Sequence, residues 1–332
     1  MAKKKKPRKK KVRSTAARRR PFRFLWVTDP WDTLDHSRDT TLRLAAEAEA
    51  LGHESHWCDL RTIRLESNQV RLDAVRLGTD GKPVSGAAPA AASPDDFDQI
   101  HYRTDPPVDL AYIHPLQLLL AGSQHAEIVN PPGILLAANE KFEALGLARA
   151  GLSPCSCISS REEDLRAFGR EHGKVVLKPL HEAQSKGVEL LDFTSAQAES
   201  AAVRKLAGTT MNWNRPVIVQ TYLPGIANGE LRLWFADGRL VAHARKLPLE
   251  GDFRVQIDRG SRLEAKPLST RDKASAKKIG AYLRRRGIRL AAVDLIDEAV
   301  TDFNFTSPGL LVQMEALARR NLAREVIRQL VK

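Results

Sequence analysis

The sequence predicts a mixed α/β protein whose second half is α+β, and three observations lead to this class. Residues 21–60 alternate an apolar strand, an amphipathic helix and a second strand, as in a β-α-β unit. After residue 150, apolar segments come in pairs joined by tight turns, which is typical of antiparallel sheets. The chain has 332 residues, of which 42% are hydrophobic, so it can bury a sizeable core in two or three subdomains. We therefore expect a soluble globular protein.

The first elements are justified by their start and stop signals. A buried strand is expected at 21–29, followed by a helix at 39–52 with Asp39 or Thr40 as its N-cap. The remaining elements expected before residue 134 are a strand at 53–60, a hairpin at 61–77 turning at Ser67-Asn68, an exposed loop at 78–96, a strand at 97–103, a helix near 109–121 and a strand at 127–133.

The second half begins with a helix at 138–151 that a glycine closes. After it we expect a strand at 155–158, a helix begun by a capping box from Ser160 to Glu163, strands at 174–180 and 187–193, a helix near 195–207, a strand at 217–224, a hairpin at 230–247 turning at Asp237-Gly238, a helix near 269–286, a hairpin at 291–305, and helices at 309–320 and 321–331. The segments from 155 to 207 are expected to make a small α+β lobe.

The N-terminal segment 1–20 carries nearly all of the excess positive charge. It contains 12 Lys and Arg and no acid, which leaves 41 basic and 40 acidic residues in the rest of the chain. Such a run cannot bury apolar surface, so we expect a disordered tail. It is interpreted as a tether to polyanions such as RNA, DNA, polyphosphate or an acidic membrane surface, and the alternative is a solvated arm with no dedicated partner.

Cysteine content and hydropathy indicate the cellular compartment. Cys58, Cys155 and Cys157 form neither a disulfide framework nor a zinc quartet, and the last two are interpreted as buried inert thiols rather than a redox pair. No segment approaches the roughly 20 consecutive apolar residues that a membrane-spanning helix needs. We expect a cytoplasmic protein without a transmembrane segment.

The hairpin at 291–308 carries three polar side chains where apolar alternation would normally continue. If its turn consists of residues 297–299, Asp294 lies opposite Asp302 with their Cβ atoms roughly 5 Å apart. Asn304 then lies on the same face as Asp302, because side chains alternate along a strand. Three oxygen donors converge, and two such close carboxylates favour a hard cation such as Mg²⁺ between them. The alternative is a solvated hairpin face.

Arg232 is a second unusual residue because it alternates with leucines in the segment ELRLWFA. It therefore shares one strand face with Glu230 and Trp234, where a permanently charged guanidinium needs an anion or a carboxylate partner. A structural pair with a nearby glutamate is the alternative to a functional role.

Three further basic residues are candidates because of their context. Lys178 ends an apolar strand and is followed by a proline, so its ammonium is expected to emerge into a cleft. Lys141 begins a helix after a loop, and Arg254 lies on a predicted loop. For each residue the alternative is an ordinary solvated side chain.

Seven segments together resemble the prokaryotic glutathione synthetase family of the ATP-grasp superfamily. In chain order they are TDP, YRTDPP, NEKF, VVLKPL, VQTYLPG, GELRLWFADGRLV and AVDLIDEAVTDFNFTSP. Their order and approximate spacing match that family over nearly the whole chain after residue 21.

The resemblance implies an ATP-grasp fold in the α/β (α+β) class, with an N-terminal Rossmann-like pre-ATP-grasp domain. ATP would be held between two antiparallel sheets, with Mg²⁺ on the last one. The implied domains are the basic tail at 1–20, the pre-ATP-grasp domain at 21–130, and the ATP-grasp domain at 131–332 with a small lobe at about 152–216.

The resemblance also implies a role for each candidate residue. The residues implied to bind ATP are Lys141 and Lys178 at the phosphates, Gln220, Tyr222 and Leu223 around the adenine, and Glu230 at the ribose. Arg232 would neutralise the transferring phosphoryl group, and Arg254 is the second candidate catalytic residue. Asp294, Asp302 and Asn304 would hold Mg²⁺, with Mn²⁺ as the other candidate ion.

These likenesses imply an ATP- and Mg²⁺-dependent carboxylate–amine ligase that works through an acyl phosphate. The substrates would be small-molecule or peptide carboxylates and amines, as in glutathione biosynthesis. Two alternatives are a nucleotide-binding protein with lost or altered ligase activity and a ligase that adds amino acids to another peptide or protein. Assembly into a homo-oligomer is left open.

The chain departs from the family pattern at three places. Asp302 stands where a glutamate is usual, and the loop HEAQSKG at 181–187 keeps only Gly187 of a glycine-rich turn. Side chains at Gln184 and Ser185 are expected to restrict positive φ angles there. The loop RVQIDRGS, which follows Asp252 and Phe253, lacks the Asn and paired Gly often found beside the peptide substrate.

Overall fold

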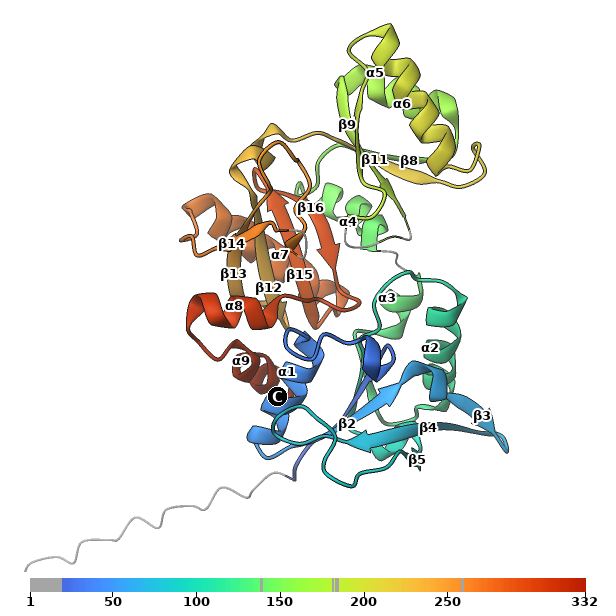
Figure 1. The fold of residues 1–332 in the computed structure, drawn as a ribbon, viewed down its shortest axis with the longest axis vertical. Coiled ribbons are helices and arrows are strands. Elements are labelled where there is room, and N and C mark those ends of the chain that lie inside the picture. The colour runs from blue at the N-terminus through green and yellow to red at the C-terminus, as the bar shows by residue number, and fades with distance from the viewer. Residues whose placement is uncertain (1–19, 138–139, 181, 183–184, 258–259) are drawn as a thin grey trace, which may run out of the picture.

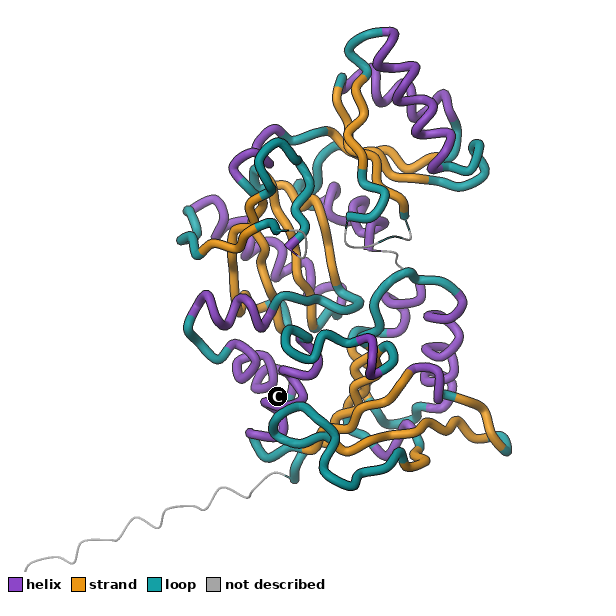
Figure 2. Tube along the Cα trace, in the orientation of Figure 1, coloured by secondary structure: helices purple, strands orange, loops and turns teal. Residues whose placement is uncertain are grey.

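The computed structural model describes residues 20–137, 140–180, 182, 185–257 and 260–332. These residues form three β-sheets with flanking helices, stacked along the longest axis of the molecule (Figure 1). The strands of the three sheets are separate groups in the chain trace (Figure 2). The predicted basic tail lies outside the described residues except for Arg20.

The first sheet is mostly parallel at its centre. Its strands are β1 (Arg23–Thr28), β2 (Glu54–Asp59), β3 (Arg64–Glu66), β4 (Gln69–Arg76), β5 (Ala90–Ala92), β6 (Gln99–Tyr102) and β7 (Glu127–Val129). The order is β3-β4-β2-β1-β6-β7, with β5 beside β4; β1 runs parallel to β2 and β6, and β6 runs parallel to β7. The predicted β-α-β start is therefore confirmed.

Three helices accompany this sheet: α1 (Thr40–Ala50), α2 (Leu110–Gly122) and α3 (Pro132–Ala137). Asp39 caps α1, since its carboxylate accepts a hydrogen bond from the Leu42 N–H at 2.8 Å. Short 3-10 turns lie at Trp31–Thr33, Leu60–Thr62 and Pro94–Asp96.

The second sheet forms the small lobe at the top of Figure 1. Its strands are β8 (Ser156–Ser159), β9 (Lys174–Pro179), β10 (Glu189–Asp192) and β11 (Val217–Thr221), in the antiparallel order β10-β9-β11-β8. The helices α5 (Glu162–His172) and α6 (Ala196–Thr209) cover one face of this sheet. Leu165 and Leu206 from these helices pack on Val175, Leu177 and Val219 of the strands, which gives the lobe its own core.

The third sheet is antiparallel and lies between the other two in Figure 1. Its strands are β12 (Glu230–Ala236), β13 (Arg239–Leu247), β14 (Arg262–Glu264), β15 (Leu290–Ile296) and β16 (Ala299–Asn304), in the order β14-β13-β12-β15-β16. A 3-10 turn at Glu140–Phe142 and α4 (Glu143–Arg149) come before the second sheet in the chain, and a 3-10 turn at Pro224–Asn228 leads into β12. The helix α7 (Thr270–Arg286) connects β14 to β15, and α8 (Leu311–Ala318) and α9 (Leu322–Leu330) follow β16.

The hairpin β15-β16 confirms the predicted pairing but not the predicted turn. Asp294 lies opposite Asp302, and Asn304 lies opposite Ala292. The turn has two residues, Asp297 and Glu298, with φ angles of 48° and 68°, as in a type I′ hairpin. A register shift between Asp294 and Leu295 inserts one extra residue into β16, which makes up for the shorter turn. A bulge, and not a longer turn, therefore brings the two carboxylates opposite each other.

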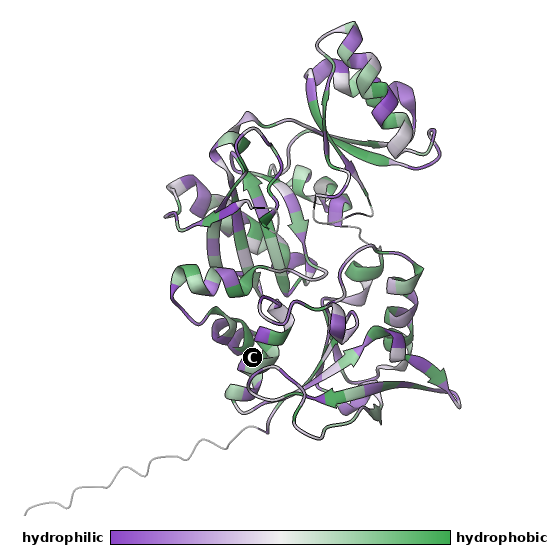
Figure 3. Ribbon diagram, viewed as in Figure 1, coloured by the Kyte–Doolittle hydropathy of each residue, from purple (hydrophilic) through white to green (hydrophobic). Residues whose placement is uncertain are grey.

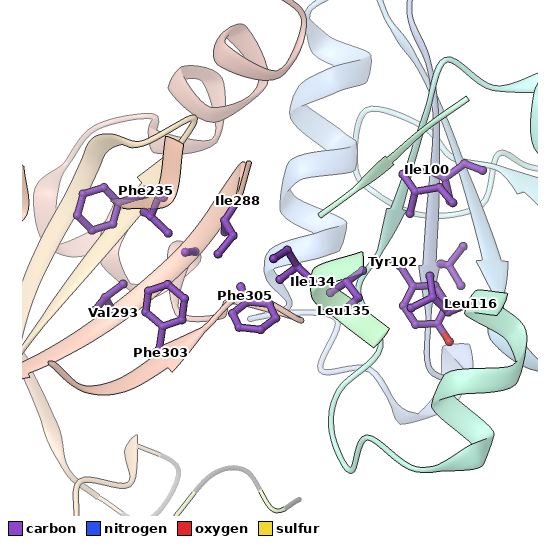
Figure 4. Close-up of a cluster of buried hydrophobic side chains, with 14 of the residues drawn as sticks. Ile100, Tyr102, Leu116, Ile134, Leu135, Phe235, Ile288, Val293, Phe303 and Phe305 are labelled. Carbon is purple, nitrogen blue, oxygen red and sulfur yellow. The ribbon is translucent and has the colours of Figure 1, made fainter. Parts of the chain in front are cut away.

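The third sheet shares its core with the first domain. Phe303, Phe305 and Ile288 approach Ile134 and Leu135 in a continuous row of buried side chains (Figure 4). On the opposite face of β12, Trp234 packs with α8 and α9, and α9 also contacts α1. The last helix of the chain therefore packs against the first domain, because apolar residues of α9 and α1 share one buried cluster. The ribbon of α9 carries both hydrophobic and hydrophilic residues (Figure 3).

Besides the turn of the hairpin β15-β16, four local predictions were wrong. The helix at 138–151 is broken: after α3, the structure has a 3-10 turn at Glu140–Phe142 before α4, and residues 138–139 lie outside the described part. The helix α5 begins at Glu162, and Ser160 forms no capping box because β8 extends to Ser159. The loop at 78–96 includes the short alanine strand β5, whose residues have low strand propensity.

The fourth error concerns the cysteines. Cys58 is buried and Cys157 is half-buried, but Cys155 is exposed because it precedes β8, the edge strand of the second sheet. All three are free thiols. Within the described ranges, no helix has the length and apolar character that would let it cross a membrane.

Candidate active site

One cleft brings together every candidate residue that the sequence pattern singled out. It encloses a cavity of about 590 Å³ between the first domain, the small lobe and the third sheet. The eleven candidates that line it are Lys141, Lys178, Gln220, Tyr222, Leu223, Glu230, Arg232, Arg254, Asp294, Asp302 and Asn304. These side chains come from segments up to 163 residues apart, so only the tertiary fold makes them neighbours.

A buried ion cluster of Glu230, Arg232, Lys246 and Asp294, hereafter the cleft ion cluster, forms one wall. Arg232 makes a bidentate pair with Asp294, with Nε–Oδ1 at 2.8 Å and Nη2–Oδ2 at 2.6 Å. Lys246 Nζ donates to Asp294 Oδ2 at 2.8 Å and also pairs with Glu230. Asp294 is 1% exposed, Lys246 5% and Arg232 8%. The charges balance, as a buried group of this kind requires.

The cations decide the protonation of Asp294. Burial alone would raise the pKa of this carboxyl, but Arg232 and then Lys246 outweigh it and hold the pKa well below its usual range. Burial raises the pKa of Glu230, and Lys246 opposes that change. Asp294 is therefore a carboxylate at neutral pH, although it is almost completely enclosed.

The chemistry of the hairpin face fits a hard cation. Asp302 faces Asp294 across the hairpin, and Asn304 lies two residues further along β16, with its amide nitrogen 3.5 Å from Asp302 Oδ2. The set offers two carboxylates and one amide oxygen, all of which line the cavity. Oxygen ligands of this kind suit Mg²⁺ better than a softer metal.

Two lysines from different elements reach into the cleft. Lys178 ends β9, and its Nζ donates to the Thr301 carbonyl of β16 at 2.5 Å. Burial lowers the pKa of Lys178, and the nearby carboxylate of Asp302 opposes that shift. Lys141 Nζ donates to the Glu182 carbonyl at 2.5 Å. Both ammonium groups therefore lie where they can contact an anion in the cavity.

The chain between the second and third sheets presents a backbone edge. Tyr222 N–H donates to the Lys174 carbonyl, and the Leu223 carbonyl accepts from Ile226 N–H. Within the described residues, the Tyr222 carbonyl and the Leu223 N–H have no hydrogen-bond partner. An adjacent acceptor and donor of this kind match the hydrogen-bonding edge of a purine. The side chain of Gln220 is used within the sheet, where it donates to Ser156 Oγ at 3.0 Å.

The loop after β13 keeps Arg254 apart from the cleft ion cluster. Its guanidinium pairs with Asp252 in the same loop, with Nε–Oδ1 and Nη2–Oδ2 both at 3.1 Å. Arg254 lines the cavity, but its ion pair in the described part of the chain is local.

The altered loop at 181–187 is only partly described, and Gln184 lies outside the described residues. Ser185 has a φ of 59° and Gly187 a φ of 66°. Ser185 thus adopts a left-handed conformation that was expected to be restricted by its side chain. Ser185 and Lys186 line the cavity.

Two residues on the cavity wall were missed by the sequence interpretation. Lys246 lies at an inward position of β13, so a charged residue on the buried face of a strand was the available signal. Glu140 accepts hydrogen bonds on Oε1 from Phe305 N, Thr306 N and Thr306 Oγ1 at 2.7, 2.9 and 3.0 Å. Nothing local in the sequence indicates that Glu140 fastens the segment directly after Asn304.

Family models match both halves of the chain. The prokaryotic glutathione synthetase N-terminal domain matches residues 22–135, and the prokaryotic glutathione synthetase ATP-grasp domain matches residues 140–319. The chain belongs to the prokaryotic glutathione synthetase family. A glutathione synthetase from Parasynechococcus marenigrum (strain WH8102) is 31% identical over 311 residues, covering 93% of this chain and 99% of its own. One from Rhodopseudomonas palustris (strain ATCC BAA-98 / CGA009) is 28% identical over 90% of this chain and 94% of its own.

Solved structures show the same fold at lower identity. D-cycloserine synthetase DcsG superposes with a TM-score of 0.65 at 17% identity, covering 93% of this chain and 100% of that chain. The macrocyclase MdnC from Microcystis aeruginosa MRC has a TM-score of 0.62 at 15% identity, covering 93% and 99%. The predicted ATP-grasp fold is confirmed.

Membership of the glutathione synthetase family makes the chain an ATP-dependent carbon–nitrogen ligase that joins a carboxylate to an amine. The predicted family, enzyme class and ligase function are confirmed. The relatives favour this function over a nucleotide-binding scaffold without turnover.

Proposed function

We propose that this ligase joins γ-glutamylcysteine to glycine, or a closely related short acid to an amine, through an acyl phosphate. The observation that carries the proposal is the cleft itself, in which two lysines, the cleft ion cluster and the oxygen face of the hairpin line one cavity. These groups match the charges of a nucleoside triphosphate and a hard cation.

The reaction proceeds in two displacements. A carboxylate oxygen of the acid attacks the γ-phosphorus of ATP, and ADP leaves with the electrons of the broken P–O bond. The amine nitrogen then attacks the acyl carbon, phosphate leaves, and the amine gives up a proton as the amide forms. Lys141 and Lys178 contact the phosphates, and the edge at Tyr222 and Leu223 binds the adenine. Gln220 remains a candidate adenine contact and Glu230 a candidate ribose contact.

Arg232 and Arg254 have different support as catalytic residues. Arg232 is fixed by its bidentate pair with Asp294, so its positive charge is preorganised beside the metal face. Arg254 would act from the loop after β13. To contact a substrate anion, its guanidinium must break its ion pair with Asp252.

The proposed ion is Mg²⁺, with Mn²⁺ as the alternative, held by Asp294, Asp302 and Asn304. When bound, such an ion neutralises charge on the transferring phosphoryl group. A structure of the ATP-grasp ligase PsnB contains its minimal precursor, Mg and ADP, which supports the same pairing of nucleotide and ion here.

A turnover assay tests the substrates. The purified chain with ATP, Mg²⁺, γ-glutamylcysteine and glycine is expected to form ADP, phosphate and the tripeptide. Omitting either substrate is expected to stop ADP release. ADP release that needs neither the acid nor the amine would contradict the proposal.

The remaining proposals concern organisation and location. We propose the domain division at residue 130, with the small lobe at about 152–216, and limited proteolysis tests it. The three free cysteines support a reducing compartment, for which we propose the cytoplasm. A homo-oligomer remains a prediction that sedimentation velocity can check.

The basic segment 1–20 is proposed to bind polyanions independently of catalysis. Its 12 positive charges contrast with a nearly neutral remainder. Removing it is expected to abolish most binding to RNA or polyphosphate and to leave turnover nearly unchanged. Binding by the intact chain is expected to weaken steeply with salt, by roughly 0.7–0.9 counterion per neutralised phosphate. A large loss of turnover on truncation would contradict this independence.

A further inference from the structure

Charged side chains at the strand ends of the first sheet line the same cavity as the cleft ion cluster. Arg103 and Asp105 directly follow β6, and Asp29 directly follows β1. From β1 the chain adds β2 on one side of the sheet and later adds β6 on the other side of β1. The strand order therefore reverses between β1 and β6. In open α/β sheets, ligands bind in the crevice at the carboxyl ends of the strands where the order reverses. Arg103 and Asp105 lie at that crevice and line the cavity.

Arg103 is a buried cation whose partners are uncharged. It is 4% exposed. Its Nε donates to Thr41 Oγ1 at 2.8 Å, and its Nη2 donates to the Pro308 carbonyl at 2.9 Å. Among the described residues it forms no ion pair with a carboxylate. Burial lowers the pKa of Arg103 to about 10, and the carboxylates of Asp39 and Asp105 oppose that shift without forming an ion pair with it among the described residues. Because a buried charge is costly without an opposite charge in contact with it, an anion from solution would complete this site.

Asp105 supplies the opposite charge on the same wall. Its side chain is open to the cleft, and its backbone N–H is held by Asp29 Oδ2 at 2.9 Å. Desolvation by the surrounding protein, and then the Asp29 carboxylate, raise the pKa of Asp105 to about 6. Two neighbouring carboxylates favour a cation between them or beside them. The wall therefore offers one site for an anion and one for a cation.

We propose that Arg103 and Asp105 bind the α-amino acid end of the acid substrate, with Arg103 on its free carboxylate and Asp105 on its free ammonium. The proposal rests on the proposed ligase function and names the two residues that select the non-reacting end of the acid. A substrate that lacks either charged group leaves one of these side chains unpaired. An enzyme strongly rejects substrates that leave its buried polar groups unpaired.

The chain sets an upper limit on the distance between Arg103 and the hairpin, and a substrate of dipeptide size is compatible with it. Arg103 bonds to the carbonyl of Pro308, which is four residues beyond Asn304. Four residues span at most about 14 Å when extended, and a dipeptide spans roughly 7–10 Å. One molecule can therefore hold its amino acid end at Arg103 and place its other carboxylate near the metal face of the hairpin.

Three acids test the two halves of this subsite separately. γ-Glutamylcysteine has both charged groups, glutarylcysteine lacks the ammonium, and γ-aminobutyrylcysteine lacks the free carboxylate. Calorimetry of each acid with a non-hydrolysable ATP analogue and Mg²⁺ measures binding, and turnover with glycine measures catalysis. The variants are Arg103→Gln and Asp105→Asn, with Arg64→Gln as a half-buried control whose Asp73 pair lies away from the cavity.

The expected result is a crossed pattern. The wild type prefers γ-glutamylcysteine to each analogue by at least about 10-fold, as charge-assisted hydrogen bonds require. Arg103→Gln removes the preference over γ-aminobutyrylcysteine and keeps the preference over glutarylcysteine, whereas Asp105→Asn does the reverse. Arg64→Gln changes neither. If Arg103→Gln does not fold, the exposed position 105 still tests the ammonium half.

Two outcomes would overturn the subsite. The first is that the wild type binds all three acids equally well or binds none of them. The second is that both variants weaken the binding of all three acids equally. Turnover of γ-glutamylcysteine without discrimination would remove the subsite and leave the proposed function intact. Crossed binding preferences without any turnover would support the subsite and contradict the proposed substrates.

Discussion

Two ion clusters in this protein, each built around one buried carboxylate, have the same balance of charges and different surroundings. The cleft ion cluster has two carboxylates and two cations, and so does a second group that we call the helix ion cluster, formed by Arg43, Glu47, Glu315 and Arg324. In the latter, Glu47 accepts hydrogen bonds from Arg43 at 3.0 Å and Arg324 at 2.7 Å, and Arg43 also pairs with Glu315 at 2.7 Å. The cluster ties α1 to α8 and α9.

The difference is access to the cavity. Both oxygens of Asp294 accept hydrogen bonds from Arg232 or Lys246, and the residue also lines the cavity opposite Asp302, so further oxygen ligands adjoin it. Glu47 is 4% exposed and is enclosed by helices, and none of the four residues of the helix ion cluster lines the cavity. Burial and charge pairing by themselves therefore indicate only a structural role in the folded state. A functional interpretation needs the additional contact with a solvent-filled site.

Removing the central carboxylate of the cleft ion cluster is expected to have the largest effect. Asp294→Asn leaves Arg232 and Lys246 without their shared anion and weakens the metal face, so we expect turnover to fall by about 10²–10³-fold. Steady-state ADP release at several Mg²⁺ concentrations measures this loss. Circular dichroism checks that the fold persists, and wild-type turnover in the folded variant would remove Asp294 from the site.

The matching change in the helix ion cluster is expected to reverse the pattern. Glu47→Gln removes a carboxylate that two cations share, which we expect to lower the free energy of unfolding by about 1.5–3 kcal/mol. Turnover by the folded fraction is expected to stay at the wild-type level. Urea denaturation measures the change in the free energy of unfolding. Glu66→Gln is the control, because the exposed pair of Glu66 with Arg64 contributes no more than about 1 kcal/mol.

The pH dependence of stability sharpens the same comparison. Burial would raise the pKa of Glu47, but hydrogen bonds from Asn321, Arg324 and Arg43 outweigh it, so the folded-state pKa lies below that of an ordinary glutamate. Its contribution is complete above the unfolded pKa of about 4.3 and is lost as pH falls through the folded value. The stability difference between wild type and Glu47→Gln should shrink in denaturation curves taken below about pH 4. A difference that grows on acidification would contradict this sign.

A smaller effect is expected from Glu140, which we regard as a positioning residue. Glu140→Ala frees the segment that follows Asn304, and we expect about a 10-fold loss in kcat/KM, or 1.4 kcal/mol, mainly as a higher Mg²⁺ requirement. Glu140→Gln keeps an acceptor oxygen and is expected to restore most of the activity. If both variants lose the same activity with an unchanged Mg²⁺ dependence, Glu140 does not act through the metal face.

The smallest expected change is at Asp302. Asp302→Glu lengthens the ligand by one methylene, which brings a carboxylate closer to the ion without moving the strand. We expect the Mg²⁺ concentration for half-maximal turnover to fall by no more than about 5-fold, or 1 kcal/mol. A higher Mg²⁺ requirement would show that the bulge at Asp294 has already adjusted the hairpin to the shorter side chain.

The sequence determined most of the elements and the pairing of the hairpin residues that we propose to bind the metal. Alternation with a period of two places Asp294, Asp302 and Asn304 on one face, and the same rule places Arg232 beside Glu230. These are local properties of strands, so they can be predicted without the fold. The turn was predicted one residue too long, and the pairing was nevertheless correct because a bulge, which alternation does not reveal, compensates.

Only the tertiary structure decided which partners these residues have. Lys246 joins Asp294 from a third strand, Glu140 reaches across to residues 305–306, and α9 returns to enclose Glu47. Each contact joins segments separated by 48 to 277 residues, and no local periodicity records such distances. In the sequence, Arg43 and Glu47 look like an ordinary helix surface pair, and Arg103 looks like a cation at the end of a strand. Packing of distant elements buries Glu47 and Arg103 and half-buries Arg43, and burial is what makes their charges consequential.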